Sequence, residues 1–151
     1  MMPVDDIDSV LPHRDGMRLI DRVVRWDDES IDVEVDVPAH GMFVDPEGVP
    51  AWVGVEYMAQ AIAAWAGCRA RAAGRPPSIG FLLGTRRYVA SQPWFPSGTT
   101  VTVHARCELI GDNGLGMFAC RIVAQGEDIA TANVSVFEPV DAMAYLESGQ
   151  A

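Results

Sequence analysis

The stretch AWVGVEYMAQAIAAWAGC, residues 51–68, decides the architecture of this chain, because Glu56 and Gln60 are its only charged or amide side chains. A proline precedes the stretch, as suits a first helical turn, and Gly74 with two prolines soon after it is a stop signal. The pattern predicts one helix over about residues 51–73, roughly 34 Å long at 1.5 Å per residue. A helix that is apolar nearly all round is typical of one buried inside a fold.

A long, mostly apolar run also raises the alternative of a membrane span. Much of the run is weakly apolar alanine, and Glu56 and Gln60 interrupt it one turn apart. The flanking sequence alternates polar and apolar residues, as strands with one wet face do. We therefore expect the buried helix of a soluble domain and no membrane contact.

Strand-like segments flank the helix on both sides. Before it, Ile31–Val37 strictly alternates Ile or Val with Asp or Glu, and Met17–Trp26 is rich in β-branched and large apolar residues. After it, four further strands are predicted: Ile79–Val89, Thr100–Leu109, Leu115–Val123 and Ile129–Phe137. No helical period separates these four, so we expect antiparallel pairing. Six strands around one buried helix need a curled sheet, which is an α+β architecture.

Length and composition fit one domain spanning residues 1–151, with its core between about residues 10 and 137. Hydrophobic residues make up 49%, enough for a core, and the net charge is −10 with arginine supplying all the cations. The chain has no basic stripe, which argues against nucleic-acid binding. Its first ten residues are acidic where a signal peptide would be basic and then apolar, so we expect a cytoplasmic protein.

The three cysteines, Cys68, Cys107 and Cys120, are widely spaced and form no CxxC pair. An odd number of cysteines without close spacing predicts reduced, partly buried thiols. This pattern predicts no metal site.

Glu56 is the most informative candidate for chemistry. A carboxylate in an apolar helix costs on the order of several kcal/mol unless it is partnered, neutral or facing a cavity. Gln60 lies one turn later on the same face and can hold the carboxylate by a hydrogen bond. We interpret Glu56 as a functional residue. The alternative is an ion pair with an arginine such as Arg86, Arg87 or Arg106.

The three histidines lie in different surroundings. His40 lies in the loop of residues 39–49 before the helix, and a histidine near a desolvated carboxyl can form an acid–base pair with it. The alternative for His40 is a solvated loop side chain. The position of His13 is more typical of a structural anchor for the first strand. His104 alternates with apolar strand residues, so we expect it to face water or a neighbouring element.

The start of the predicted helix offers backbone donors. The first N–H groups of a helix lack internal partners and lie at its positive dipole end. If the preceding loop leaves them accessible, the N–H groups around Ala51 and Trp52 can polarise a thioester carbonyl as an oxyanion hole. Four large side chains either line a tunnel beside this site or belong to the core: Trp52, Tyr57, Met58 and Trp65.

Three segments, in this order, resemble a known family. LPHRDGMRLIDRV at residues 11–23 is similar to the opening of 3-hydroxyacyl-acyl-carrier-protein dehydratases of the FabZ and FabA type. EYMAQ at 56–60 resembles their helix motif E-x-M-A-Q, and FPSGT at 95–99 resembles their P-x-P-G-D corner. Their G-H-F-P-G loop becomes AHGMF at 39–43, which looks more like the divergent dehydratase subunits of aryl-polyene pathways. The resemblance implies the hot-dog fold, in which a curved antiparallel sheet wraps a long central helix.

The same resemblance implies reversible dehydration of a 3-hydroxyacyl thioester on acyl carrier protein to the trans-2-enoyl product, in fatty-acid or polyene-type biosynthesis. No cofactor or metal is implied. His40, with His13 as the fallback, would be the base, and a protonated Glu56 would donate to the departing hydroxyl. Substrate-binding roles would fall to Ala51, Trp52, Tyr57 and Gln60.

Two other functions stay open. A hot-dog thioesterase uses a helix carboxylate to activate water, often without a histidine. The changed loop at residues 39–43 keeps open a catalytically weak partner subunit or an acyl-binding module.

The resemblance also implies partners. Hot-dog proteins pair their sheets edge to edge, so we expect at least a dimer, either a homodimer or a heterodimer with a related hot-dog subunit. His40 and Glu56 serving one substrate would then come from opposite protomers. The family's carrier protein is acidic, and a domain of net charge −10 must offer it a local positive patch. The candidate residues are Arg69, Arg71, Arg75, Arg86 and Arg87.

Overall fold

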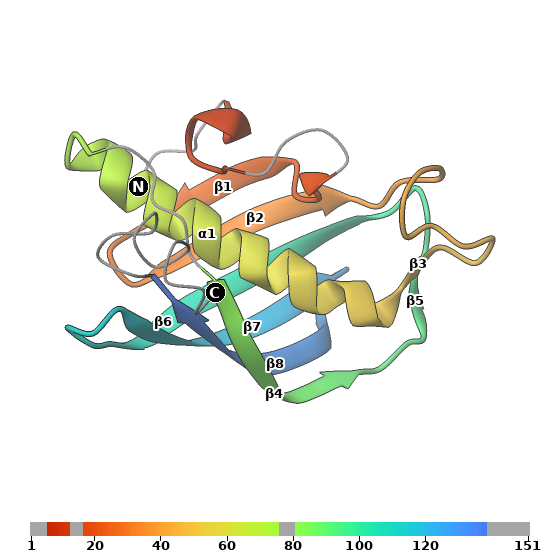
Figure 1. Ribbon diagram of the computed structural model, residues 1–151. Coiled ribbons are helices and arrows are strands. Elements are labelled where there is room, and N and C mark those ends of the chain that lie inside the picture. The colour runs from red at the N-terminus through yellow and green to blue at the C-terminus, as the bar shows by residue number, and fades with distance from the viewer. Residues whose placement is uncertain (1–5, 13–16, 76–80, 139–151) are drawn as a thin grey trace.

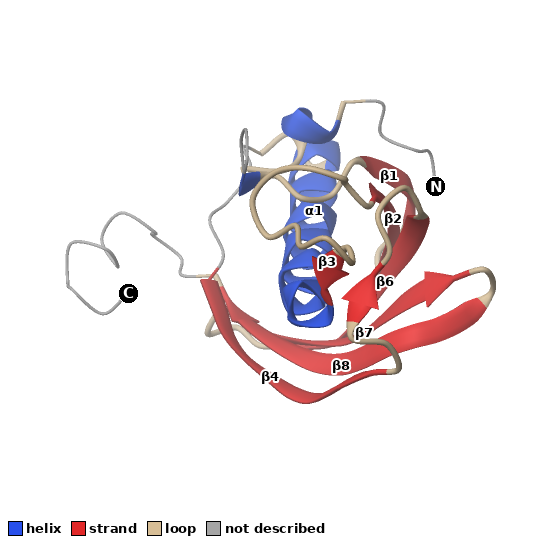
Figure 2. Ribbon diagram, turned by 90° about the vertical axis from the view of Figure 1, so that its right-hand side faces the viewer, coloured by secondary structure: helices blue, strands red, loops and turns tan. Residues whose placement is uncertain are grey.

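A long helix, α1 (Gly54–Ala72), lies along the concave side of a curled antiparallel sheet in the computed structural model, which describes residues 6–12, 17–75 and 81–138 (Figure 1). The strand order is β1-β2-β6-β7-β8-β4. The strands are β1 (Arg22–Trp26), β2 (Ser30–Asp36), β6 (Thr100–Ile110), β7 (Leu115–Ala124), β8 (Glu127–Phe137) and β4 (Phe81–Ala90). Figure 2 shows the sheet wrapping the helix from the β1 edge to the β4 edge. The predicted hot-dog architecture is confirmed.

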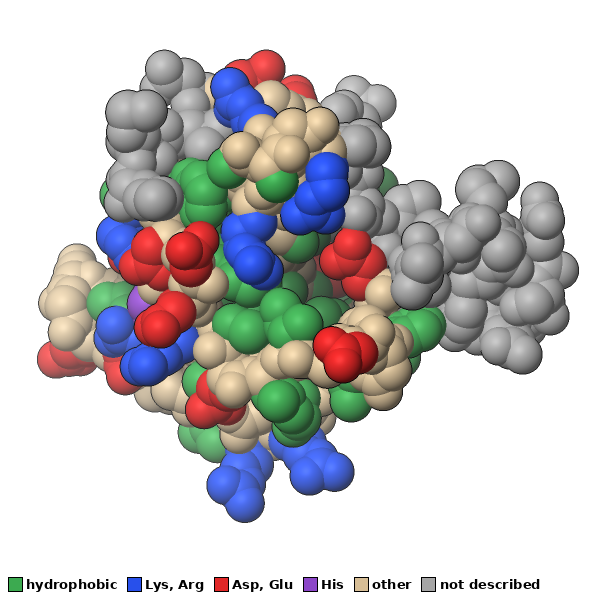
Figure 3. Space-filling view, turned by 90° about the vertical axis from the view of Figure 1, so that its left-hand side faces the viewer, with side chains coloured by type: hydrophobic (Ala, Val, Ile, Leu, Met, Phe, Trp, Pro, Cys, Tyr) green, Lys and Arg blue, Asp and Glu red, His purple; other side chains and the backbone are tan. Residues whose placement is uncertain are grey.

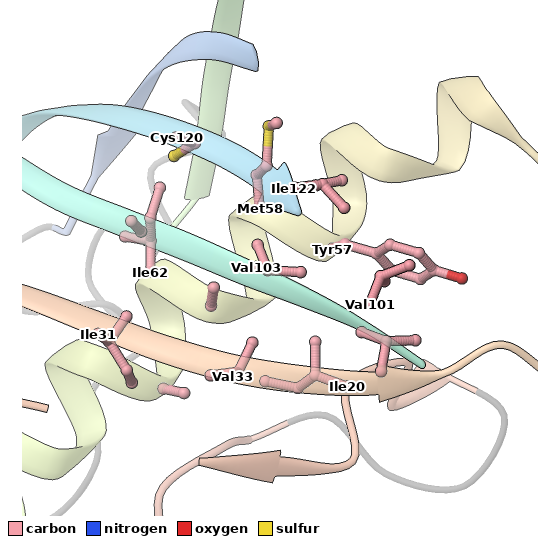
Figure 4. Close-up of a cluster of buried hydrophobic side chains, with 14 of the residues drawn as sticks. Ile20, Ile31, Val33, Tyr57, Met58, Ile62, Val101, Val103, Cys120 and Ile122 are labelled. Atoms are coloured by element: carbon pink, nitrogen blue, oxygen red, sulfur yellow. The ribbon is translucent and has the colours of Figure 1, made fainter. Parts of the chain in front are cut away.

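The core fills the space between α1 and the inner face of the sheet. Met58 of α1, Ile31 of β2, Val103 of β6 and Ile122 of β7 all contribute to this core, and all four side chains are buried (Figure 4). The alternation read from the sequence of β2 places its Ile and Val residues on this inner face. Burying one such large side chain contributes about 1.5–3 kcal/mol, so this layer is the main source of stability.

The helix begins later than the sequence predicts. Residues Ala51–Val53 form a 3-10 turn, η3, and α1 starts at Gly54. Pro50 precedes the turn, a position where a missing N–H costs nothing. The helix ends at Ala72, close to the predicted end. None of the helices within the described ranges combines the length and the hydropathy that a membrane span requires.

The first strand is shorter than predicted, because β1 begins at Arg22 and not at Met17. The backbone of Met17, Leu19 and Ile20 is hydrogen-bonded to the side chain of Gln60 instead of to a neighbouring strand. The later strands β6, β7 and β8 lie within two residues of their predicted bounds. Residues 79 and 80, predicted to begin the next strand, lie outside the described residues.

A second, two-stranded sheet was not predicted. It joins β3 (Val49–Pro50) to β5 (Trp94–Phe95), in segments that the sequence marks as loops. This pairing ties the chain just before the helix to the connection between β4 and β6. The start of the helix is therefore held at a fixed place against the sheet.

The strand β4 forms one edge of the main sheet, with β8 on its inner side. No described strand pairs with its other side. Leu82, Leu83 and Val89 of β4 are exposed, each by more than two fifths of its surface. A ten-residue edge with unpaired backbone groups and apolar side chains is suited to pairing with another chain.

Candidate functional site

Glu56 lies in the first turn of α1, where a hydrogen bond from Gln60 fixes its carboxylate. The Gln60 Nε2 atom donates to Glu56 Oε1 over 3.2 Å, as the spacing of one helical turn predicts. Glu56 is half-buried, although the sequence predicts a carboxyl deep in an apolar surrounding. The reason is that α1 is not covered all round.

One face of α1 stays half-open in the single chain. Between positions 55 and 68, five residues are half-buried while the others are buried: Val55, Glu56, Ala59, Ala63 and Ala66. Glu56, Ala59, Ala63 and Ala66 are three or four residues apart, which places them in one row along the helix, with Val55 beside its first residue. Glu56 therefore lies near one end of a row whose remaining side chains are small or apolar.

Gln60 is the best-satisfied side chain of the site, and it is fully buried at 0% exposure. Its Oε1 atom accepts the N–H groups of Leu19 at 2.8 Å and Ile20 at 3.4 Å, and Nε2 donates to the Met17 carbonyl at 2.7 Å. With the bond to Glu56, all four hydrogen-bonding positions of the amide are used. These bonds hold the amide between Glu56 and the segment before β1, and the expected contact of Gln60 with substrate stays a prediction.

The helix start offers fewer free donors than expected. The N–H of Ala51 donates to the Pro93 carbonyl over 2.9 Å, so it is not available to a substrate oxygen. The hydroxyl of Tyr88 on β4 donates to the Ala51 carbonyl, which locks this turn against the edge strand. The remaining candidate of the predicted oxyanion pair is the N–H of Trp52. Tyr88 has no signal in the sequence, because its role arises from the folding of β4 against η3.

The large side chains near the helix start divide between core and surface. Tyr57 is buried and stacks on Phe95 with ring centroids 5.6 Å apart, and burial raises the pKa of its hydroxyl. Trp52 is 64% exposed and packs edge-on against Phe43, so it does not line a tunnel within this chain. Tyr57 also borders a cavity of about 140 Å³ beneath the loop before the helix, together with Val49.

The histidines are not brought to Glu56 within one chain. His40 is exposed in the loop between β2 and β3 and makes no hydrogen bond or ion pair with the described residues. His13 lies outside the described residues. His104 is half-buried on β6, where its Nδ1 atom contacts the Asp32 carboxylate of the neighbouring strand. That contact confirms the expectation that His104 faces a neighbouring element.

The five arginines expected to meet a carrier protein lie on two separate surfaces. Arg69 stacks over the Trp65 ring at 4.7 Å and Arg71 donates to Ser9 Oγ at 3.0 Å, both near the end of α1. Arg86 and Arg87 belong to β4, and neither makes an ion pair with the described residues. Arg75 follows α1.

Among the described residues, Glu56 makes no ion pair with Arg86, Arg87 or Arg106, the arginines named for its alternative role. Arg106 lies 3.9 Å from Glu29, and the two arginines of β4 have no carboxylate partner in the described part of the chain. No three His, Cys, Asp or Glu side chains among the described residues are grouped as a metal site requires. The three cysteines are free thiols, as predicted.

The comparisons with known proteins point to one family. The family described as ApeP-like, ApeP dehydratase, matches residues 5–147. Among solved structures, the dehydratase heterocomplex ApeI:P from Xenorhabdus doucetiae is similar with a TM-score of 0.87 and 27% identity. That match covers 96% of this chain and 97% of the other.

More distant structures share the fold alone. The virulence protein Cj0977 from Campylobacter jejuni matches with a TM-score of 0.65 and 10% identity, over 89% of each chain. The PaaI protein of the E. coli phenylacetic acid degradation operon matches with a TM-score of 0.59 and 17% identity, over 79% of this chain and 78% of that one. No curated protein sequence is matched.

Proposed function

This chain belongs to the ApeP-like dehydratase family, and we propose that it removes water from a 3-hydroxyacyl thioester carried by an acyl carrier protein. The product is the trans-2-enoyl thioester. The observation that carries the proposal is the position of Glu56, a carboxylate held by Gln60 in the half-open row of α1. A substrate lying on that row would meet one acid group with a fixed orientation.

The step divides between an acid and a base. The base takes a proton from C2, the electron pair forms the C2–C3 double bond, and the C3 hydroxyl leaves as water with a proton from Glu56. We assign the base to His40 and the stabilisation of the thioester oxygen to the N–H of Trp52.

A second subunit is part of this proposal. His40 is exposed and does not contact Glu56 of its own chain, which supports a site shared between two protomers. The open edge of β4 supports pairing through that strand. The relative from Xenorhabdus doucetiae is described as a heterocomplex, so we propose a related hot-dog subunit as the partner.

For the carrier protein we propose contact with Arg86 and Arg87. Both are exposed and without ion pairs in the described chain, so their charges are available to an acidic partner. Arg87 also lines a hollow together with His104, Arg106 and Arg121, so the basic surface extends beyond β4. Arg69 and Arg71 are engaged with Trp65 and Ser9.

The reaction is tested by incubating the chain, alone and with its related subunit, with a panel of 3-hydroxyacyl carrier proteins. Mass spectrometry should detect the loss of one water without release of thiol. Glu56→Gln should abolish this loss, and Glu47→Gln, at an exposed loop carboxylate, should leave it unchanged. Thiol release would overturn the proposal in favour of a thioesterase. Dehydration by the pair that survives Glu56→Gln would assign this chain the role of a supporting subunit.

The shared site is tested by complementation. If the chain pairs with itself, His40→Ala and Glu56→Gln homodimers should both be nearly inactive. After subunit exchange, about half the dimers are heterodimers, each with one intact site, so roughly a quarter of native activity should return, because acid and base act as one unit. A mixture that stays inactive after verified exchange would exclude a site shared between two copies.

The carrier contact is tested by charge reversal. Replacing Arg86 and Arg87 with glutamate should raise KM for carrier-bound substrate and leave KM for a small thioester mimic nearly unchanged. Arg71→Glu, at the other surface, is the matched control and should affect neither substrate. Equal losses on both substrates would mean that the β4 arginines are structural.

A further inference from the structure

A hollow of about 540 Å³ lies on the outer face of the main sheet, where residues of β6 and β7 alternate with those that enter the core. It crosses β6, β7, β8 and β4, and its size is within the range of small-molecule sites. Figure 3 shows basic side chains projecting below the sheet, on the side away from the helix. The cationic and polar side chains that line the hollow are Arg87, His104, Arg106, Arg121, Thr131 and Asn133. A chain of net charge −10 thus gathers three of its arginines at one hollow.

The register of the sheet places these side chains in two adjacent rows. In one row, His104 of β6 lies opposite Arg121 of β7. In the next row, Arg106 of β6 lies opposite Ala119 of β7, and Asn133 of β8 follows. Side chains directly opposite each other are about 5 Å apart at Cβ, and the two rows are about 7 Å apart along the strands. Each row offers a cation, and the small side chain of Ala119 leaves space between Arg106 and Asn133.

A third arginine reaches the hollow from the edge strand β4. Arg87 has a φ of 57°, in the left-handed region that favours glycine. It lies between Arg86 and Val89, where a β-bulge shifts the pairing of β4 with β8. Bulges re-aim side chains and are common beside functional sites, and a residue held in an unfavourable backbone conformation points to a function. The bulge therefore supports a binding role for this face of the sheet.

The arginines of β6 and β7 keep donors for a ligand. Arg106 lies 3.9 Å from Glu29 and Arg121 lies 3.2 Å from Asp128, but about half or more of each of these side chains is exposed. Exposed ion pairs contribute little to stability, so a ligand can compete with them at small cost. A guanidinium also has five N–H donors, which is more than one carboxylate uses.

His104 is oriented by the neighbouring strand. Its Nδ1 atom contacts the Asp32 carboxylate, and Arg25 holds the other oxygen of that carboxylate at 3.1 Å. Within the described ranges, the Nε2 atom of His104 makes no hydrogen bond. With Nδ1 engaged, Nε2 is the ring nitrogen left for a ligand. The ring thus adds a directed contact beside the charge of Arg121.

This set of groups matches the oxygens of phosphate. Arginine suits phosphate because its planar fork can donate two parallel hydrogen bonds. Two rows of donors about 7 Å apart favour a ligand with more than one phosphate group over a single phosphate. A second copy of this chain is a poor occupant of the hollow, because symmetric pairing would bring the same arginines against one another.

We propose that this hollow binds the diphosphate group of a small molecule, either inorganic diphosphate or a nucleoside diphosphate. Arg106, Arg121 and His104 hold the phosphate oxygens, and Arg87 lies at the rim. Glu56 belongs to the helix on the other side of the sheet, so this ligand is not the substrate of the proposed dehydration. The inference goes beyond the proposed function and does not depend on it.

The test is calorimetric titration of the full chain, alone and with its related subunit, with adenosine diphosphate, inorganic diphosphate and inorganic phosphate. Both diphosphates should bind at least tenfold more tightly than inorganic phosphate. Arg121→Gln should weaken the binding of adenosine diphosphate about tenfold, which is about 1.4 kcal/mol. The matched control is Arg71→Gln, which removes the same charge at the end of α1 and should leave the binding unchanged. Equal binding of the two diphosphates supports the diphosphate group alone as the ligand, and tighter binding of adenosine diphosphate supports a nucleotide.

A substitution that keeps the charge tests the hollow itself. Ala119→Leu should fill the space between the arginines and weaken the binding of adenosine diphosphate about tenfold. Thr102→Leu, on the same outer face of the sheet but outside the hollow, should leave that binding unchanged. Equal losses for Arg121→Gln and Arg71→Gln would overturn the site in favour of general attraction between charges. Failure of both diphosphates to bind would also overturn it, and weaker binding of the acidic carrier protein to Arg121→Gln would then assign the hollow to the carrier.

Discussion

The Nε2 atom of Gln60 donates both to Glu56 Oε1 at 3.2 Å and to the Met17 carbonyl at 2.7 Å. One buried amide thus joins the candidate acid to the segment that leads into β1. Because Oε1 of the same amide holds Leu19 and Ile20, the position of Glu56 depends on that segment being in place.

Gln60→Met replaces the amide with an apolar side chain of similar volume. It should nevertheless lower the free energy of unfolding far more than a change of similar volume in the core would. The change leaves the buried N–H of Ile20 and the part-buried groups of Met17 and Leu19 without this partner, and an unsatisfied buried group costs about 1–3 kcal/mol. We expect a loss of about 3 kcal/mol in the free energy of unfolding, measured in urea. Gln92→Met, at an exposed position, should change it by less than about 0.5 kcal/mol. Equal effects of the two substitutions would contradict this role for Gln60.

The cysteines should differ in reactivity. Burial raises the pKa of Cys68 to about 11 and that of Cys120 to about 12, so both are almost entirely protonated at pH 8. Cys107 is only half-buried. A thiol reagent at pH 8 should label Cys107 first in the folded protein and reach the other two only after unfolding, as mapped by mass spectrometry. Rapid labelling of Cys120 in the native state would contradict its buried position.

The main features of the fold could be predicted from periodicity. The apolar run of α1 and the alternation in β2 follow from helix and strand geometry, and each has a strong pattern. The pairing of β3 with β5 could not be predicted, because two-residue strands carry no period. The late start of β1 depends on one side chain, Gln60, which replaces a strand partner for the residues before Arg22, and no local pattern indicates this.

The candidate site was predicted in part. The spacing of Glu56 and Gln60 indicated their hydrogen bond, since residues four apart share a helix face. The use of the Ala51 N–H by Pro93 is a contact across more than forty residues, and sequence alone does not reveal it. Sequence alone likewise does not show that Arg86 and Arg87 on β4 lie apart from Arg71 at the end of α1, because the path of the folded chain decides where these arginines lie.

Acid should remove the contribution that the ion pair between Arg22 and Asp36 makes to the free energy of unfolding. Hydrogen bonds from Arg22 and then from Thr100 lower the pKa of Asp36 to about 2, below the value of about 3.9 for an unfolded chain. The folded pKa is the lower one, so the stabilisation is present above about pH 4 and is lost as the pH falls toward 2. Both side chains are about half exposed, so solvent screening limits the contribution to about 1 kcal/mol.

Asp36→Asn should accordingly lower the free energy of unfolding by about 1 kcal/mol at pH 7, with the difference from the native protein closing by pH 2. Urea unfolding at a series of pH values measures this. Glu47→Gln, at an exposed loop carboxylate, should follow the native protein throughout. A difference for Asp36→Asn that is constant with pH would mean that the carboxylate charge is not the source of the effect.

The contact between Gly54 and Tyr88 should appear as coupling between two substitutions. A Cβ at Gly54 would overlap the Tyr88 hydroxyl and lie 3.0 Å from both Ile122 Cδ1 and Phe95 Cζ. Gly54→Ala gains about 1 kcal/mol of helix propensity, but overpacking costs about 1–3 kcal/mol, so we expect a net loss. Tyr88→Phe removes the overlapping hydroxyl and its bond to the Ala51 carbonyl, costing about 1 kcal/mol alone.

In the double variant the alanine methyl can occupy the space of the missing hydroxyl. The combined loss in the free energy of unfolding should therefore be smaller than the sum of the single losses by about 1 kcal/mol or more. Gly67→Ala is the contrasting case, because its Cβ would overlap the backbone carbonyl of Val10, which no side-chain change relieves. The losses in the free energy of unfolding from Tyr88→Phe and Gly67→Ala should simply add in that double variant. Strict additivity in the Gly54 pair, measured in the same urea experiments, would show that the start of α1 does not pack against β4 in the way described.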